Sequence, residues 1–599
     1  MILDELCRLY ERMADDPSCQ VPKPGWSNEK VAWEVTLTAD GECASLVSCV
    51  SGEGKDKKNY TEMSVPEHGN RTSGVKPYFL CDTAAYFFGI DEKNGEKKRD
   101  ASRTLHEAVL KECEDPGARA IMAFFEREGQ GTLSGQYALN LREGGGLIVF
   151  SLLGDEGPIH ARPAVAQAWR EYLDRSSDAP IGMCSVSGKR GPLARLFPQV
   201  TGIPGAQSAG ASLVSFNFNA TESYGREQAY NASISEHVAF ASGAALKALM
   251  SDKSRRIPFG STQVVFWSDR PAPLENDVMQ MLLLGEAPKG AEDKATNMTV
   301  SECLLNIRKG KPTAGLDGTV RFFILGIAPN AARLSVRFFE ESTFGALAEH
   351  FGEYLRDVAI EGVETTSLRR LLLQTAPLGK TENVPNTLVN RCFASMISGK
   401  DFPQALGQLV LSRMRADHAA NNVWDMGQRA ALLKACYVRK RRNQGMKTSK
   451  EELIDVSLNR ENANIGYVLG RLFAVMERAQ QAALGETNAT IRDRYIGAAA
   501  TTPKRVFTPL LRGYHVHASM LRKNNPGLYR VLESEMDEIV GNRLDGMLAV
   551  PSALDSDGQA EFNIGYFQER TDLWKSRTKK NASEPNEETE GDALAIEEE

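Results

Sequence analysis

The sequence of 599 residues predicts an α+β protein, in which a mixed N-terminal α/β body with antiparallel strands is followed by an all-α C-terminal helical bundle. Segments rich in β-branched and aromatic residues alternate with helical segments over the first two thirds of the chain. Beyond about residue 362 only the helical periodicity continues. With 42% hydrophobic and 25% charged residues, the chain has the composition of a globular protein with sizeable cores.

The first elements are a helix and a hairpin. Residues 1–14 have helical periodicity, and VAWEVTLT at 31–38 alternates apolar residues with smaller or polar ones, as a half-buried strand does. A second strand at about 44–50 follows the dipeptide Asp40-Gly41, which favours a hairpin turn. The next elements that we expect are helices at about 78–90, 100–114 and 117–128 and a buried strand at 147–153.

The middle of the chain predicts further strands, at 262–268, 319–329 and 333–341, because β-branched and aromatic residues dominate them. The turn dipeptide Pro329-Asn330 joins the last two. Helices such as 233–250 and 344–358 separate these strands, which is why the body is expected to be α+β.

The last third predicts a helical bundle. One apolar helical stripe in 463–484 consists of Ile465, Val468, Leu469, Leu472, Phe473 and Met476. Other segments with helical periodicity are 404–416, 427–441, 505–523 and 526–547. Short connections and few prolines inside the elements favour a bundle.

Charge is unevenly distributed along the chain. The formal net charge is −7, but residues 581–599 hold eight acids and no base. Residues 391–450, in contrast, carry twelve Lys or Arg against three acids. Such a stretch is either a solvated helix face or a track for phosphates, since each neutralised phosphate releases condensed counterions. The cations proposed for the track are Arg413, Arg415, Arg439, Lys440, Arg441 and Arg442.

The sequence has no common catalytic motif: the GxxxxGK[ST] phosphate loop, HExxH and GxSxG are all missing. The ten cysteines and eight histidines lack metal-site spacing, so we expect no metal, no cofactor and no disulfide. We also expect a cytoplasmic protein that does not enter a membrane. The first residues have no signal-peptide pattern, and no apolar run reaches the roughly 18 residues of a spanning helix.

Several loops have the residue types that nucleic-acid readers use. Lysines and arginines can hold phosphates, and Asn or Arg can read base edges, while glycines let a backbone approach closely. Each loop could equally be an exposed turn that satisfies its own backbone. The candidates are Lys55, Lys57 and Lys58 in GEGKDKKNY, Asn70, Arg71, Thr72 and Lys76 in GNRTSGVKPY, Lys189 and Arg190 in GKRGP, and Asn217 and Asn219 after the strand-like ASLVSF.

Four stretches resemble a known family. They are GNRTSGVKPYFLCDTAAYFFGI (69–90), CSVSGKRGPLARLFPQVTGIPGAQSAGASLVSFNFNATESYGREQAYNASIS (184–235), STQVVFWSD (261–269) and FFILGIAPNAARLSVRFF (322–339). In this order they resemble the large subunit of the type I-C CRISPR surveillance complex, Cascade, and the resemblance runs nearly end to end. Two departures stand at Phe197, where the family often has His, and at Ser233, where it often has Pro.

The resemblance implies a non-catalytic subunit of an antiviral, crRNA-guided complex. Such a subunit recognises the protospacer-adjacent motif on duplex DNA, helps to unwind the duplex, stabilises the R-loop and supports recruitment of a nuclease-helicase. The other implied partners are the Cascade backbone, the crRNA-processing subunit and the small subunit. Two alternatives stay open: a Mg-dependent nuclease whose carboxylates the spacing does not reveal, and a purely structural adaptor.

Charge, helical periodicity and the resemblance together predict a division of the chain. We expect residues 1–370 to recognise the motif and to dock on crRNA and backbone, 371–475 to form the basic helical segment, and 476–580 to resemble the small subunit. Residues 581–599 are expected to be an acidic, disordered tail. In this family the small subunit often comes from an internal translation start. Met476 is the candidate, since 124 residues remain from there onward.

Overall fold

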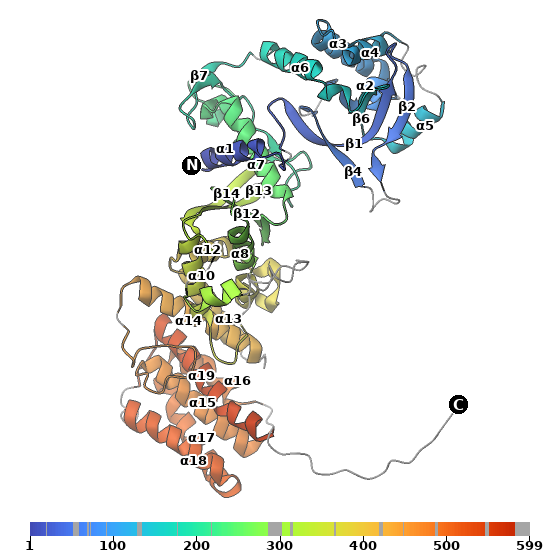
Figure 1. The fold of residues 1–599 in the computed structure, drawn as a ribbon. Helices are drawn as coiled ribbons and strands as arrows, with labels where there is room; N and C mark the ends of the chain where they lie inside the picture. Colours follow the sequence, from blue (N-terminus) through green and yellow to red (C-terminus); the bar gives the residue numbers. More distant parts are fainter. Residues whose placement is uncertain are drawn as a thin grey trace, which may run out of the picture. The chain divides into compact units, whose positions relative to one another are not determined.

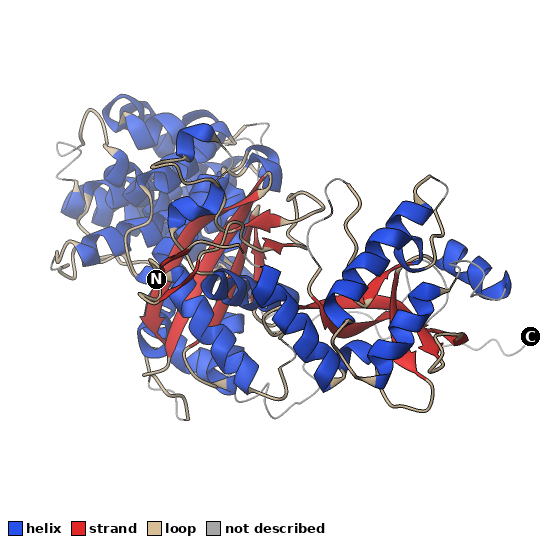
Figure 2. Cartoon of the chain, turned by 90° about the horizontal axis from the view of Figure 1, so that it is seen from above, coloured by secondary structure: helices blue, strands red, loops and turns tan. Residues whose placement is uncertain are grey.

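The computed structural model describes the chain except for residues 20, 52–58, 69–70, 72–73, 92, 128–134, 177, 217, 285–301, 312–314, 365–366, 418–422, 447, 486–488, 545–549 and 582–599. The fold is α+β, as predicted: strands with helices around them occupy one part of the chain, and helices alone another (Figures 1 and 2). Two compact units form, Met1–Ser251 with Asn330–Leu334, and Asp252–Pro329 with Ser335–Glu599. The boundaries predicted at residues 370, 475 and 580 stay predictions.

The first unit contains a six-stranded sheet in the order β3-β4-β1-β6-β5, with β2 also paired to β1. Its strands are β1 (Trp26–Leu37), β2 (Cys43–Ser48), β3 (Val50–Ser51), β4 (Asn59–Pro66), β5 (Cys81–Thr83) and β6 (Leu147–Leu152). The predicted hairpin is confirmed, because β1 and β2 are antiparallel around Gly41, whose φ is +76°. The sheet is mixed, since β1 is parallel to β6.

Helices pack on this sheet around an aromatic core that contains Phe87, Phe124 and Phe150. They are α2 (Ala84–Phe87), α3 (Gly95–Leu110), α4 (Pro116–Glu126), α5 (Gly135–Gly144) and α6 (Pro163–Ser176). The helix predicted at 78–90 is wrong. Residues Cys81–Thr83 form β5 at the sheet edge, and Leu80 has a φ of +50°, which an α-helix does not allow.

His106 of α3 is fully buried in this core. Its Nδ1 lies 2.7 Å from the Ser102 carbonyl oxygen, and its Nε2 accepts the Leu80 N–H at 3.0 Å. Burial lowers the pKa of His106 from its ordinary 6.5 to about 4. The folded protein therefore binds fewer protons than the unfolded chain between these pH values, and stability is lost as the pH falls through this window.

We accordingly expect acidification from pH 7 to pH 5 to destabilise the protein by about 2 kcal/mol through His106. Urea unfolding at the two pH values measures the effect, with His106→Gln as the variant that cannot titrate. A His106→Gln protein with the same pH dependence as the wild type would contradict this account.

The remainder of the first unit joins α1 (Ile2–Asp15) to α7 (Glu236–Ser251), and Tyr10 meets Phe240 edge to face between them. A two-stranded hairpin, β7 (Ile181–Met183) and β8 (Arg190–Pro192), precedes α7. The stretch that resembles a strand after Ala211 forms only β10 (Ala211–Ser212), which pairs with β9 (Gln199–Val200) and with Arg333.

The second unit begins with the antiparallel strands β11 (Arg256–Phe259), β12 (Thr262–Ser268), β13 (Arg321–Asn330) and β14 (Arg333–Thr343), adjacent in this order. The predicted strands 262–268, 319–329 and 333–341 are thus confirmed. Helices α8 (Pro273–Leu284), α10 (Phe344–Val358), α11 (Leu368–Leu372) and α12 (Asn386–Ser398) share one core with β12 and β13.

Helices alone follow Thr343 in the described part of the chain, which confirms the predicted bundle. They include α13 (Gln404–Ala416), α14 (Val423–Asn443), α15 (Ile465–Leu484), α16 (Ile491–Thr501), α17 (Pro503–Asn524), α18 (Pro526–Asp537) and α19 (Ser556–Asn581). Helix α15 is the centre of the bundle, since Val468, Leu472 and Phe473 of the predicted stripe are buried. None of the ten cysteines, all of which lie among the described residues, forms a disulfide bond. None of the described helices combines the length and the apolar character needed to cross a membrane.

Candidate nucleic-acid interface

Arg71 is enclosed by its own loop and sheet. Its guanidinium donates to both carboxylate oxygens of Asp82, a fully buried residue, and Nε donates to the Lys76 carbonyl oxygen at 2.6 Å. The rings of Tyr78 and Tyr86 lie 3.7 and 3.8 Å from the guanidinium carbon. Burial raises the pKa of Asp82, and Arg71 opposes that shift. Because Asp82 and the Lys76 carbonyl oxygen accept from the Arg71 guanidinium, and Tyr78 and Tyr86 cover its faces, Arg71 positions the loop rather than binding a base.

The other candidates of this region divide into two groups. The Lys76 side chain is exposed just beyond the Arg71 contact. Five further candidates, Lys55, Lys57, Lys58, Asn70 and Thr72, lie outside the described residues. The sequence-based interpretation of this loop as a reader therefore stays a prediction, with Arg71 as the residue that positions it.

Lys189 and Arg190 are exposed on the β7–β8 hairpin, beside a cavity of about 680 Å³. Asp4, Arg8 and Glu11 of α1 line the same cavity, so its charge is mixed. The hairpin is tied to the start of α7 through the buried Cys184. Burial raises the pKa of this thiol, but hydrogen bonds from Ser187 and Ser235 outweigh burial and lower it to about 6.

The polar run after Phe216 bends into turns instead of continuing as a strand. Asn219 begins a 3₁₀ turn, Asn219–Thr221, and is exposed, while Asn217 lies outside the described residues. Two aromatic residues of this segment are also exposed, Phe218 (57% exposed) and Tyr224 (97% exposed). The segment thus presents rings as well as amides to solvent.

The basic stretch in α14 is engaged in ion pairs within the second unit. Arg439 is fully buried, donates to Asp357 at 2.9 Å and to the Ser395 carbonyl oxygen at 3.0 Å, and Arg442 donates to both oxygens of the same aspartate. Lys440 lies 2.7 Å from Asp557 across the surface. These three side chains of α14 are therefore not free cations in solvent, because they form ion pairs with aspartates of α10 and α19.

The remaining predicted cations of the stretch also have partners. Arg441 lies 2.8 Å from Glu452, and Arg413 forms an ion pair with Asp417. Arg415 is exposed and lies 3.4 Å from Gln559. Their role at phosphates stays a prediction, and it requires breaking or sharing these contacts.

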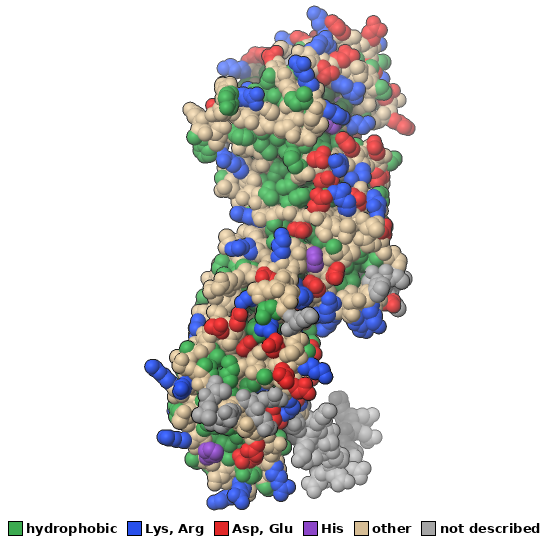
Figure 3. Space-filling model, turned by 90° about the vertical axis from the view of Figure 1, so that its left-hand side faces the viewer, with side chains coloured by type: hydrophobic (Ala, Val, Ile, Leu, Met, Phe, Trp, Pro, Cys, Tyr) green, Lys and Arg blue, Asp and Glu red, His purple; other side chains and the backbone are tan. Residues whose placement is uncertain are grey.

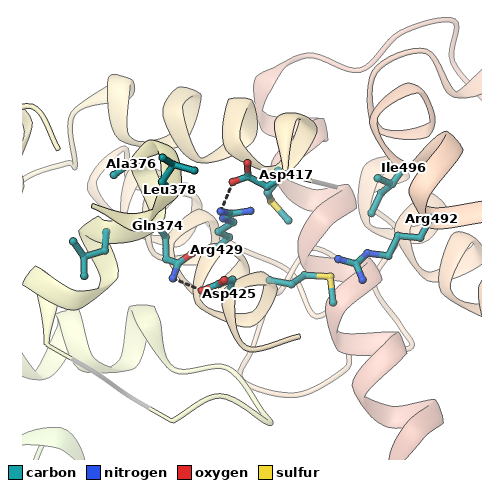
Figure 4. Close-up of a pocket in the computed structure, with 12 residues that line it drawn as sticks. Gln374, Ala376, Leu378, Asp417, Asp425, Arg429, Arg492 and Ile496 are labelled. Atoms are coloured by element: carbon teal, nitrogen blue, oxygen red, sulfur yellow. Dashed lines mark hydrogen bonds and ion pairs between the residues drawn. The ribbon is translucent and has the colours of Figure 1, made fainter. Parts of the chain in front are cut away.

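A pocket of about 290 Å³ lies between α13, α14 and α16 and is drawn in Figure 4. Two carboxylates line it, but Asp417 is held by Arg429 at 2.7 Å, and Asp425 accepts a hydrogen bond from Gln374 at 2.7 Å. A metal-dependent nuclease needs several free carboxylates or imidazoles around its ion. Within the described residues, groups of three or more such ligands do not occur.

Helix α17 carries a basic face that the sequence analysis missed. Five Lys or Arg of this helix are exposed and its sequence contains no acid; they are Lys504, Arg505, Arg512, Arg522 and Lys523. Among the described residues, these side chains have no ion-pair partner. Arg505, Arg512 and Lys523 share one helical face over about 27 Å, at a rise of 1.5 Å per residue. Several lysine and arginine side chains lie at the lower end of the view in Figure 3, at the height where Figure 1 labels α17 and α18.

The signal that could have found α17 is the absence of acids rather than the density of bases. PKRVFTPLLRGYHVHASMLRKN has 22 residues without one Asp or Glu, so its cations cannot pair within the helix. The stretch 391–450 has more bases, but carboxylates from elsewhere in the chain pair with several of them, including Arg439, Arg441 and Arg442.

Met476 lies in the middle of α15 and is 1% exposed, so it is a core residue in the full-length chain. A product that starts there would lack Arg471, whose Nε lies 2.9 Å from the buried Glu569. Burial raises the pKa of Glu569 to about 6. The use of Met476 as a translation start stays a prediction. The short product would need another partner for the Glu569 carboxylate in place of Arg471.

Comparison with known proteins adds one match. The model of a family described as CRISPR-associated protein (Cas_Csd1) matches residues 6–574, nearly the whole chain. Comparison with the curated proteins finds no match.

Proposed function

Since the chain belongs to the CRISPR-associated Cas_Csd1 family and is a Cascade-type protein, we propose that it is the non-catalytic large subunit of a type I-C Cascade complex. In this role it recognises the protospacer-adjacent motif on duplex DNA, helps to open the duplex and holds the R-loop. Its partners are crRNA, target DNA, the backbone and crRNA-processing subunits, the small subunit and a nuclease-helicase.

The observation that carries the proposal is the row of exposed, unpaired cations on α17. Cations that have no carboxylate partner are free to replace the counterions of a phosphate backbone, which supplies most sequence-independent affinity for nucleic acid. Paired arginines such as Arg439 would have to break a buried ion pair first. Helix α17 is therefore a better phosphate track than the stretch predicted from Arg413 to Arg442.

Sequence preference belongs to a different part of the chain in this proposal. Phosphate contacts position a protein on DNA, whereas base-edge contacts specify the sequence. Lys76, held in place by the Arg71 anchor, and the exposed Asn219 are the described candidates for the motif duplex. A guided complex needs only this short protein-read motif, since base pairing reads the remainder of the target.

The proposal predicts binding without cleavage. Incubated with end-labelled duplex DNA and Mg²⁺, the purified chain should shift the DNA in a gel, and the label should stay on full-length strands. The shift should weaken steeply with salt, because phosphate contacts dominate. Shortened labelled fragments would favour the nuclease alternative. Absence of any shift, both alone and within the assembled complex, would favour the structural adaptor.

A further inference from the structure

A tight turn in the first unit presents one tyrosine ring to solvent. The Arg226 N–H donates to the Ser223 carbonyl oxygen at 3.0 Å, and these two residues also form an antiparallel bridge. Between them, Tyr224 has a φ of +54° and Gly225 a φ of +68°. Two positive φ values at the central positions are those of a type I′ turn.

Tyrosine is an unfavourable residue for this position. Type I′ turns prefer Asn, Asp or Gly at their first central position, because a Cβ atom crowds the backbone when φ is positive. Strain of this kind is offset when the side chain packs against the protein, but the Tyr224 side chain is 97% exposed. The ring therefore contributes almost no packing to the fold, and strained residues of this kind cluster at ligand contacts.

The turn is nevertheless held firmly by Asn231. The side-chain oxygen of Asn231 accepts the Ser223 N–H at 2.9 Å, and its amide donates to the carbonyl oxygens of Arg226 and Gln228 at 2.7 and 2.9 Å. Arg226 in turn donates to the Ser233 hydroxyl at 2.7 Å. Ser233 itself has a φ of +49°. These contacts fix the turn that carries the ring, so its backbone is preorganised.

A second ring lies in the same segment. Phe218 is 57% exposed, and the guanidinium of Arg333 lies 4.7 Å from its centroid. The flanks of the turn carry Glu222 and Glu227, both exposed, beside Arg226. Two carboxylates and two guanidinium groups thus balance each other here, so the local charge does not favour a phosphate, whereas the uncharged ring of Tyr224 is exposed.

We propose that Tyr224 is a stacking residue for an unpaired nucleobase. The inference rests on the proposed function and names the part of the nucleic acid that this turn contacts. Aromatic rings stack on bases of any sequence because every base has a π-face. A protein partner fits less well, because hot-spot residues at protein interfaces sit among packed neighbours that exclude water, whereas the Tyr224 side chain is 97% exposed.

The test combines a stability measurement with a binding measurement on the full chain. Tyr224→Asn places a residue that favours the turn, so the melting temperature should stay equal or rise. Affinity for a duplex with one unpaired 2-aminopurine should fall about 5- to 150-fold, the range for losing one stacked base. Tyr224→Phe should keep both the affinity and the quenching of 2-aminopurine fluorescence, since the ring faces remain.

Leu378→Asn is the matched control, because Leu378 is also exposed (83%) with a φ of +60°. It should leave DNA binding unchanged. Wild-type affinity and quenching in Tyr224→Asn would overturn the inference while leaving the proposed function intact. The inference would also be overturned if Tyr224→Asn bound DNA normally but no longer co-purified with another subunit, because Tyr224 would then contact a protein partner. If the wild-type chain binds neither a fully paired duplex nor the duplex with the unpaired base, the proposed function fails together with this inference.

Discussion

Replacing Arg439 with Met is expected to lower the free energy of unfolding by about 3–5 kcal/mol, although the residue lies in a run of four consecutive bases that resembles a solvated surface. Arg439 is fully buried, and so is its partner Asp357. After removal of the arginine, Asp357 is paired with Arg442, whose side chain is 35% exposed. Loss of one partner of a buried pair costs more than the pair contributes, because the remaining charge is poorly compensated.

The adjacent residue supplies the control. Lys440 is 44% exposed and pairs with Asp557 on the surface, where an ion pair contributes at most about 1 kcal/mol. The free energy of unfolding of Lys440→Met, measured in urea, should therefore lie within about 1 kcal/mol of the wild-type value. Equal stabilities for the two variants would show that Arg439 is not the interior anchor that the structure describes.

Neutralising the face of α17 is expected to have the largest effect on nucleic-acid binding. The triple variant Arg505→Gln, Arg512→Gln and Lys523→Gln should bind DNA of any sequence about tenfold or more weakly at 0.15 M salt. The slope of log affinity against log salt should decrease by about 2 to 3, since each lost phosphate contact contributes about 0.9. Discrimination between motifs should stay, because these contacts do not read bases.

The control removes the same charge from three exposed arginines that already pair with carboxylates. Arg8 pairs with Asp4, Arg103 with Glu107 and Arg175 with Glu171. Replacing those arginines with Gln should leave the salt slope within about 0.5 of the wild type. If both triple variants changed the slope equally, net charge rather than the α17 face would determine affinity.

The sequence predicted elements where local pattern and tertiary context agree. Strand β12 and helices α10 and α13 match their predicted ranges because one periodicity dominates each segment. Segment 78–90 failed because its apolar residues suit a helix as well as a strand. Its true state depends on distant partners: Asp82 is neutralised by Arg71, and Cys81 pairs with Val149 of β6.

The candidate site was predictable only in part, for a related reason. A count of bases along the chain identified 391–450, but it could not reveal that Asp357 and Glu452 neutralise part of that charge from other elements. Tyr224 lies in the polar run that follows Phe216, but its exposure and its strained backbone emerge only from the folded turn. Lys76 and Asn219 were predicted and are exposed, as a contact surface requires.

The central claim is that this chain recognises a short motif on duplex DNA for a guided complex. The most direct measurement compares target binding by the complete complex on two duplexes that share the guide-complementary sequence and differ only in the adjacent motif. We expect the scrambled motif to weaken binding by about 5- to 150-fold per mismatched base pair, corresponding to about 1–3 kcal/mol each. Equal affinities for the two duplexes would contradict the account.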